Sequence, residues 1–155
     1  MGCLLNGSIA QEPENIKAIR RDIIDMLFGS AYALYSTHKH TPENPRIRFI
    51  APLSRPVTEE EYVALGKKVA EQIGIDYFDD TSYQPHRLMY WPSTSSDAEY
   101  LFTHQDTDWL NPDDVLKQYV DWRDPLEWPT SSRQQLDHKK LADKQGDPYE
   151  KPGLI

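Results

Sequence analysis

The sequence predicts an α+β fold, in which a small antiparallel or mixed sheet carries helices on one of its faces. Two longer segments have apolar residues at helical spacing, and four short segments have the apolar character of strands. They follow one another as helix, strand, strand, helix, strand, strand, an order typical of a sheet covered by helices on one side. A chain of 155 residues with 38% hydrophobic content can bury one modest core of this kind.

The first helix is predicted over Pro13 to Phe28, with Gly29 as its stop. Charged residues lie largely on its other faces, and its apolar stripe consists of Ile16, Ile19, Ile23 and Leu27. The next segment, Ala31 to Ser36 (AYALYS), has the continuous apolar character of a short buried strand. An amphipathic helix packed on a sheet is therefore expected at the start of the domain.

The second predicted strand, Arg46 to Ala51 (RIRFIA), alternates charged and apolar residues. Its apolar residues share one face, while Arg46 and Arg48 share the other, because successive side chains of a strand point to opposite sides. The loop between the two strands, Thr37 to Pro45, is polar. We expect Arg48 and His38 on the face of the sheet that the helices leave open.

The second helix has unusually complete start signals. Thr58 and Glu61 match a capping box, and Val57 can pack on Tyr62 as a hydrophobic staple. Gly74 stands where a left-handed cap would end the helix. The predicted core stripe is Tyr62, Leu65, Val69 and Ile73.

Two further strands are predicted, Leu88 to Trp91 (LMYW) and Glu99 to Thr103 (EYLFT), separated by a Ser-rich turn. A short helix capped by Asn111 follows, running through Pro112 to Tyr119. From residue 130 the sequence is polar and has no apolar period. We therefore expect one domain over residues 1–129 and a flexible linker or tail over residues 130–155.

The charge is unevenly distributed. A net charge of -8 and a pI near 5.0 argue against a protein that coats duplex DNA, because non-specific affinity comes from neutralising phosphates. The segment from Ala31 to Arg55 nevertheless has Glu43 as its one acid, against four cations, Lys39, Arg46, Arg48 and Arg55. A basic face on an acidic body favours a focused phosphate site.

The single cysteine, Cys3, excludes an internal disulfide and favours a reducing, cytoplasmic compartment. No segment approaches the roughly 20 apolar residues of a membrane span. We expect a cytoplasmic protein, in a bacterial host or a phage-infected cell, without a membrane partner.

The tripeptide Ser36, Thr37 and His38 (STH) follows the first predicted strand. Hydroxyl and imidazole groups can donate hydrogen bonds to phosphate oxygens, although a surface turn is the simpler interpretation of so short a pattern taken alone. The neighbouring Arg46 and Arg48 strengthen the phosphate interpretation, because arginines on a sheet face make bidentate phosphate contacts. The alternative for both arginines is a solvated sheet face.

Two adjacent acids, Asp79 and Asp80, follow the apolar pair Tyr77 and Phe78. Carboxylates at such an edge can bind Mg²⁺ together with substrate phosphates. The alternative is an ordinary turn, for which DDTS is also suitable chemistry. Arg87 can pair with either acid or reach a nucleotide.

Four segments, taken in order, resemble the primase domain of phage and prophage primase-helicase proteins, the virulence-associated E-like phage primases of the archaeo-eukaryotic primase superfamily. The resemblance covers about Asp22 to Arg133, and its segments are YSTHKHTPENPRIRFIAPLSRPVTEEEY, GIDYFDDTSYQPHRLMYWPS, WLNPDDVL and DWRDPLEWP. It implies an RRM-like α+β catalytic module that joins nucleotides on a DNA template with two divalent metals. The implied cofactor is Mg²⁺ or Mn²⁺, and the implied substrates are nucleoside triphosphates and a single-stranded DNA template.

The resemblance also assigns roles to residues. The second motif of the family, a small residue, any residue and a histidine, matches Ser36 to His38 and implies that His38 contacts the phosphates of the incoming nucleotide. The third motif, an apolar residue and an acid, matches Phe78 with Asp79, and Asp80 is the near alternative. The implied catalytic residues are His38 and Asp79, and the implied metal ligands are Asp79 and Asp80.

The remaining nucleotide contacts implied by the resemblance are Ser36 beside His38, and the arginines Arg46, Arg48 and Arg87. The first motif of the family, a pair of acids one residue apart on a strand, has no match. Its place is taken by CLLNGSIAQEP, with the neutral residues Asn6, Gly7 and Ser8. Neutral groups are poor ligands for a two-metal site.

Two hypotheses follow for the function. The first is a primase-type nucleotidyltransferase domain of a phage or mobile-element replication protein, truncated at both ends and weak or inactive by itself. The second is a non-catalytic module that binds nucleotides, single-stranded DNA or a replisome partner. In the first case a helicase domain, or an N-terminal part on another chain, is an expected partner.

Overall fold

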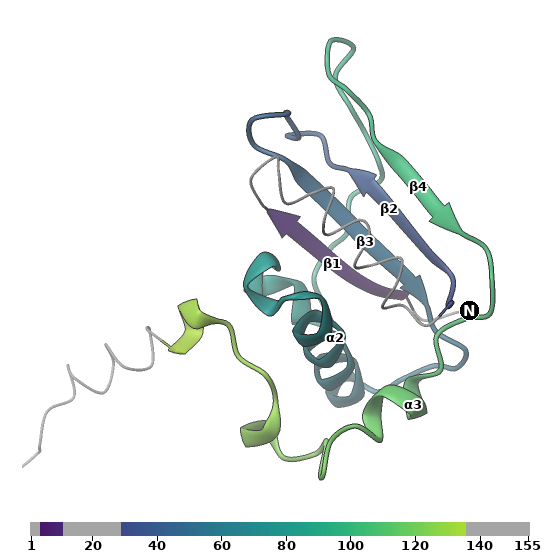
Figure 1. Ribbon diagram of the computed structural model, residues 1–155, viewed down its shortest axis with the longest axis vertical. Helices are drawn as coiled ribbons and strands as arrows, with labels where there is room; N and C mark the ends of the chain where they lie inside the picture. The colour runs from purple at the N-terminus through teal and green to yellow at the C-terminus, as the bar shows by residue number, and fades with distance from the viewer. Residues whose placement is uncertain (1–3, 11–28, 136–155) are drawn as a thin grey trace, which may run out of the picture.

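The computed structural model describes residues 4–10 and 29–135 and contains a four-stranded sheet with helices on one face (Figure 1). Its strands lie in the order β1-β3-β2-β4, and each neighbouring pair is antiparallel. Their bounds are β1 Leu4–Ala10, β2 Tyr32–Ser36, β3 Arg46–Pro52 and β4 Phe102–Gln105. The predicted α+β class is confirmed. The helix predicted over Pro13 to Phe28 lies outside the described residues.

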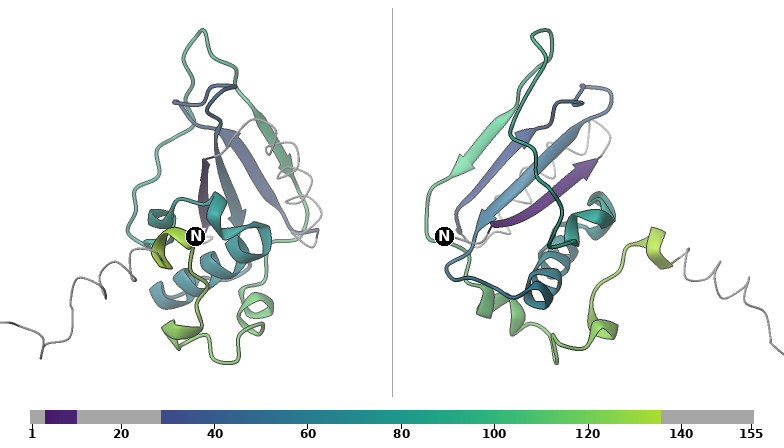
Figure 2. Two further views of the ribbon diagram at one scale, coloured as in Figure 1. Left: turned by 60° about the vertical axis from the view of Figure 1, so that its left-hand side comes forward. Right: turned by 180° about the vertical axis from the view of Figure 1, so that it is seen from behind.

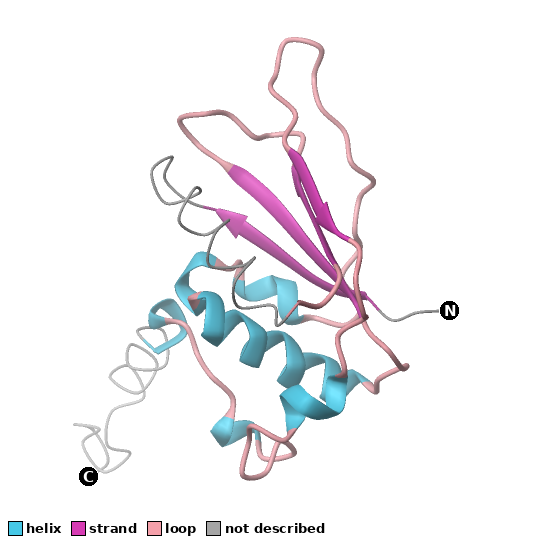
Figure 3. Cartoon of the chain, turned by 45° about the vertical axis from the view of Figure 1, so that its right-hand side comes forward, coloured by secondary structure: helices cyan, strands magenta, loops and turns pink. Residues whose placement is uncertain are grey.

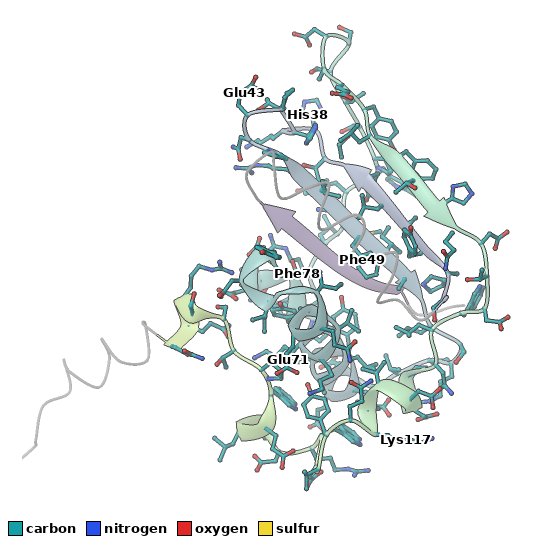
Figure 4. The ribbon with its side chains drawn as sticks, viewed as in Figure 1. His38, Glu43, Phe49, Glu71, Phe78 and Lys117 are labelled. Atoms are coloured by element: carbon teal, nitrogen blue, oxygen red, sulfur yellow. The ribbon has the colours of Figure 1, made fainter. Side chains whose placement is uncertain are left out.

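The β2-β3 hairpin, formed by the first two predicted strands, lies at the centre of the sheet. Leu34 pairs with Phe49, and Tyr35 pairs with Arg48. Leu34 and Phe49 are each 1% exposed and belong to the core beneath the sheet. Because successive side chains alternate, Tyr35 and Arg48 lie on the opposite, open face. Figure 4 shows Phe49 on the side of the sheet that faces the helical layer.

Helix α2 (Glu59–Ile73) covers the core face of the sheet, and the cyan helices of Figure 3 lie to one side of the magenta strands. Both hydrogen bonds of the predicted capping box form: the Thr58 hydroxyl accepts from the Glu61 amide at 3.2 Å, and the Glu61 carboxylate accepts from the Thr58 amide at 2.9 Å. Gly74 ends the helix with a φ of 126°. The buried face consists of Ala64, Leu65, Val69, Ala70 and Ile73.

The strand predicted over Leu88 to Trp91 is wrong, since these residues form no strand. The strand that pairs with β2 is β4, which begins three residues later than the predicted Glu99 to Thr103 strand. Ser36 fixes this start, because its amide donates to the Leu101 carbonyl and its hydroxyl accepts from the Leu101 amide, both at 2.9 Å. The LMYW run therefore has no neighbouring strand and stays exposed.

Strand β1 occupies the place where the family's acid pair is expected. In the β1-β3 register, Ser8 is opposite Arg48 and Asn6 is opposite Ile50. Opposed positions share a face of the sheet, so positions 6 and 8 belong to the open face. The sequence of β1 has no acid at either position.

Two shorter parts complete the helical layer. Helix α3 (Pro112–Leu116) starts at Asn111, whose side chain accepts from the Asp113 amide as predicted. Residues 129–135, the C-terminal segment, follow η3 (Pro125–Glu127), and Ser132 and Arg133 bond to Asp76 and Asp80, which come shortly after α2 (Figure 2). Among residues 4–10 and 29–135, no helix has the length and apolar content needed to cross a bilayer.

Candidate functional site

A cavity of about 540 Å³ lies at the end of the sheet where β2 stops and β3 begins. The β2-β3 loop and the segment from Gln84 to Leu101, here called the 84–101 segment, both extend from this end of the sheet (Figure 1). The cavity is lined by Tyr35, Thr37, His38, Lys39, Arg46, Arg48, Asp79, Arg87, Tyr90, Trp91, Pro92 and Ser93. Its walls thus come from the sheet and the β2-β3 loop on one side, and from the 84–101 segment, which is distant in sequence, on the other.

The lining is strongly basic. Four cationic side chains, Lys39, Arg46, Arg48 and Arg87, face one carboxylate, Asp79. This local excess of positive charge stands against a net charge of -8 for the whole chain. Arginine guanidinium groups bind phosphate through parallel charge-assisted hydrogen bonds, so the lining suits an anion with several oxygens.

Two buried polar atoms at this site have no hydrogen-bond partner among the described residues: the Tyr35 hydroxyl and the Nε of Arg48. Tyr35 is only 4% exposed, and its side chain lines the cavity next to Arg48. Buried donors without partners are rare because each costs about 1–3 kcal/mol of desolvation. An oxyanion in the cavity would satisfy both donors.

The loop that carries His38 is held by its neighbours. His40 is 5% exposed, and its Nδ1 accepts from the Arg46 amide at 3.1 Å, while the Thr37 amide donates to the Arg46 carbonyl at 2.9 Å. These bonds tie both ends of the loop to each other, and His38, two residues after the end of β2, is exposed (Figure 4). His38 Nδ1 lies 3.3 Å from the hydroxyl of Ser93.

The adjacent acids Asp79 and Asp80 point to different partners. Asp79 lines the cavity: its Oδ1 accepts from the amide and hydroxyl of Thr81 at 3.0 and 2.8 Å, and its Oδ2 lies 3.5 Å from Arg87. Asp80 instead pairs with Arg133 at 3.2 Å and does not line the cavity. The two carboxylates are not directed at one point.

Burial by itself would raise the pKa of Asp79. The hydrogen bonds from Thr81 and the charges of Arg87 and Arg133 outweigh that effect, so the pKa of Asp79 lies below its usual value. Asp79 therefore stays ionised at neutral pH and balances part of the positive charge of the cavity.

The structure brings together five of the residues predicted from the sequence, and these line one cavity: His38, Arg46, Arg48, Asp79 and Arg87. Ser36 and Asp80 lie outside it. Ser36 is fully buried, and its hydroxyl holds the start of β4.

Sequence reasoning missed the aromatic part of the lining, Tyr35, Tyr90 and Trp91. Tyr35 had a usable signal, because its position in AYALYS alternates with that of the core residue Leu34. The sequence signal at Tyr90 and Trp91 was misleading, since LMYW has the composition of a buried strand.

A two-metal centre does not fit the described side chains. Asp79 is the one carboxylate in the cavity lining, and residues 4–10 and 29–135 contain no group of three His, Cys, Asp or Glu side chains arranged to hold an ion. Mg²⁺ can be held by one or two carboxylates together with substrate phosphates. Asp79 is the residue that would make such a contact here.

The open face of the sheet continues the aromatic surface beyond the cavity. Phe102 pairs with Tyr35 and His104 with Ala33 in the β2-β4 register, so both rings lie on the open face. Their ring centroids are 5.4 Å apart with an interplanar angle of 27°, and Phe102 is 54% exposed. Exposed, flat rings of this kind are suited to stacking.

Comparisons with known proteins identify one family. The family model described as the VapE N-terminal domain matches residues 13–131, which include every described residue that lines the cavity. No curated protein and no solved structure gave a significant match. The match bears out the predicted resemblance to virulence-associated E-like proteins, and the more specific assignment to a primase domain stays a prediction.

Proposed function

Because the chain belongs to the VapE N-terminal domain family, we propose that it is a nucleotide-binding, primase-type domain of a phage or mobile-element replication protein. Its ligand is a nucleoside triphosphate, whose phosphates bind among Lys39, Arg46, Arg48 and Arg87. The observation that carries the proposal is the pair of buried donors without partners, the Tyr35 hydroxyl and Arg48 Nε, in this cation-lined cavity.

The proposed activity is nucleotide transfer on a single-stranded DNA template with Mg²⁺ or Mn²⁺, in which His38 contacts the phosphates and Asp79 contacts the metal. The neutral positions 6 and 8 and the pairing of Asp80 with Arg133 leave a single carboxylate at the cavity. We therefore expect weak or no polymerisation by this chain alone. A helicase domain, or a chain that supplies further acids, is the partner proposed for full activity.

The second candidate function is a non-catalytic module that binds nucleotides, single-stranded DNA or a replisome partner. The same single carboxylate favours it, because binding a triphosphate needs cations and donors but no paired acids. The exposed pair Phe102 and His104 on the open face also fits stacking on unpaired bases.

Nucleotide binding is tested by titrating the chain with a fluorescent ATP analogue. Arg48→Ala should weaken binding about tenfold or more, because a charge-assisted hydrogen bond and a buried donor are both removed. The matched control is Arg123→Ala, which removes an exposed arginine that packs on Trp122 outside the cavity and should leave affinity unchanged. No saturable binding by the wild-type chain, or equal losses in the two variants, would contradict the proposal.

The two candidate functions are separated by dinucleotide synthesis on single-stranded templates with Mn²⁺. Synthesis that is lost in His38→Ala supports the nucleotidyltransferase. Saturable nucleotide binding without any synthesis supports the binding module, and synthesis that is unaffected by His38→Ala would contradict the assigned role of that histidine.

A further inference from the structure

The residues Leu88 to Trp91 expose an unusually apolar surface. Leu88 is 72% exposed, Tyr90 73% and Trp91 91%. Large apolar side chains exposed side by side commonly mark a binding surface, because isolated proteins otherwise keep such groups scattered. The run belongs to the 84–101 segment and lies beside the cavity.

The structure fixes these aromatic residues next to the cations. Tyr90 and Trp91 line the same cavity as Arg46, Arg48 and Arg87. The Nη1 of Arg48 donates to the Tyr90 carbonyl at 3.2 Å, so the backbone that carries both rings is tied directly to the basic lining. One cavity therefore has a charged wall, formed by Arg46 and Arg48 of the sheet with Arg87 beside them, and an aromatic wall on the 84–101 segment.

This juxtaposition selects among ligands by their chemistry. An inorganic polyphosphate would use the charged wall alone, and an apolar peptide would use the aromatic wall alone. A nucleotide uses both, because it joins a flat base to a chain of phosphates, and bases stack on tryptophan and tyrosine rings.

Building on the proposed function, we propose that Trp91, supported by Tyr90, stacks on the base of the nucleotide whose phosphates bind Arg46, Arg48 and Arg87. The contact is largely independent of base identity, since every base has a face on which to stack. Trp91 is thus a positioning residue that orients the nucleotide and distinguishes it from other polyphosphates.

The test compares ATP with inorganic tripolyphosphate as ligands in calorimetric titrations of the full chain. Trp91→Ala should weaken ATP binding about tenfold, the loss expected for one stacked base, and leave tripolyphosphate binding unchanged. Trp91→Phe, which keeps an aromatic ring, should recover most of the ATP affinity. The side chain is so exposed that its removal should leave the fold intact, which circular dichroism verifies.

The matched control is Trp109→Ala, which removes a tryptophan that is 53% exposed and does not line the cavity. It should change neither affinity. If Trp91→Ala weakens the binding of both ligands equally, or of neither, the stacking assignment is overturned, while phosphate binding stays in place. If both affinities are unchanged, the exposed residues Leu88 to Trp91 would instead be assigned to a contact with another protein. Failure of the wild-type chain to bind either ligand would overturn the proposed function itself.

Discussion

Arg48 connects the two walls of the cavity. Its backbone lies in β3 between β1 and β2, its Nη1 donates to the Tyr90 carbonyl, and its Nε is buried without a partner among the described residues. One guanidinium thus holds the 84–101 segment and still offers a donor to a ligand. A lysine has no fork of donors with which to do both, so Arg48→Lys would not be a conservative change.

Asp79 makes the stability of the protein sensitive to acid. Its pKa is lower in the folded chain than in the unfolded chain, so the stability that its charge contributes is present above the unfolded pKa, near 3.9. That contribution is lost as the pH falls through the lower, folded pKa. Wild-type protein should therefore lose stability as the pH falls below about 4, and Asp79→Asn should lose less over the same window.

Urea denaturation at a series of pH values measures this difference. Asparagine can still accept the Thr81 amide hydrogen bond, so Asp79→Asn removes the charge and keeps the cap. Asp106→Asn, a change at an exposed acid outside the cavity, is the control. The prediction is wrong if the two variants show the same dependence on pH.

Helix α2 shows which elements the sequence specifies locally. Its start and its end depend on residues within four positions of each terminus, Thr58, Glu61 and Gly74, and all are visible as sequence signals. One link between the start of the helix and the rest of the fold depends on a residue distant in sequence, Asp113. Arg55 makes this link, because it pairs with Glu61 at 3.0 Å and with Asp113 at 2.6 Å. Hydrogen bonds from Arg55 outweigh partial burial and hold the pKa of Glu61 below its usual range.

Thr58→Ala should lower the free energy of unfolding by about 1 kcal/mol, because the Glu61 amide loses its side-chain acceptor. Chemical denaturation measures the change. Thr58→Ser keeps a hydroxyl at the cap and should remain close to wild type. Equal stabilities of the two variants would show that the capping box contributes nothing to stability.

The 84–101 segment shows where local signals fail. The composition of LMYW predicts a strand, but of the two strands predicted after α2 only the one that begins near Leu101 pairs with β2. That choice is decided by residues that are distant in sequence, such as Ser36 and Leu101, whose hydrogen bonds fix the start of β4. The aromatic wall of the cavity was therefore missed for the same reason that the strand was wrongly predicted.

Asp79 and Asp80 also show that local sequence signals do not reveal contacts with distant residues. Two adjacent carboxylates predict a shared metal, and the sequence pattern cannot tell which of them faces the cavity. Asp80 is turned away by Arg133, a residue more than fifty positions later. The cations were easier to predict, because Arg46 and Arg48 alternate with core residues on one strand and so must share its other face.

At the scale of the whole molecule, the C-terminal segment packs against the acids that follow α2, Asp76 and Asp80. Ser131 is fully buried, and the Ser132 amide donates to the Asp76 carboxylate at 2.7 Å. Arg133 donates to the carbonyls of Asp76 and Phe78 and to the carboxylate of Asp80. The first residues of the predicted tail thus contact the backbone that places Asp79 at the cavity.

Arg133→Ala should destabilise the chain by about 1–2 kcal/mol, since two carbonyls and one partly exposed carboxylate lose a charged donor. The change is measured as a shift in the urea midpoint. Arg123→Ala, at an exposed arginine that packs on Trp122, should cause no comparable shift. Equal shifts in the two variants would mean that the C-terminal segment does not hold the domain together.

The central position of the β2-β3 hairpin has a consequence for how the cavity assembles. Tyr35 and Arg48 are neighbours across a short loop, so bringing them together closes little chain, whereas the contact between Arg48 and Tyr90 spans 42 residues. Arg46 and Arg48 are therefore placed by one local unit, whereas Arg87 and the aromatic wall join them only after a long loop has closed. Detachment of the 84–101 segment would remove Arg87 and the aromatic wall together but leave Lys39, Arg46 and Arg48 in place, so part of the capacity to attract phosphate does not depend on the segment that would recognise a base.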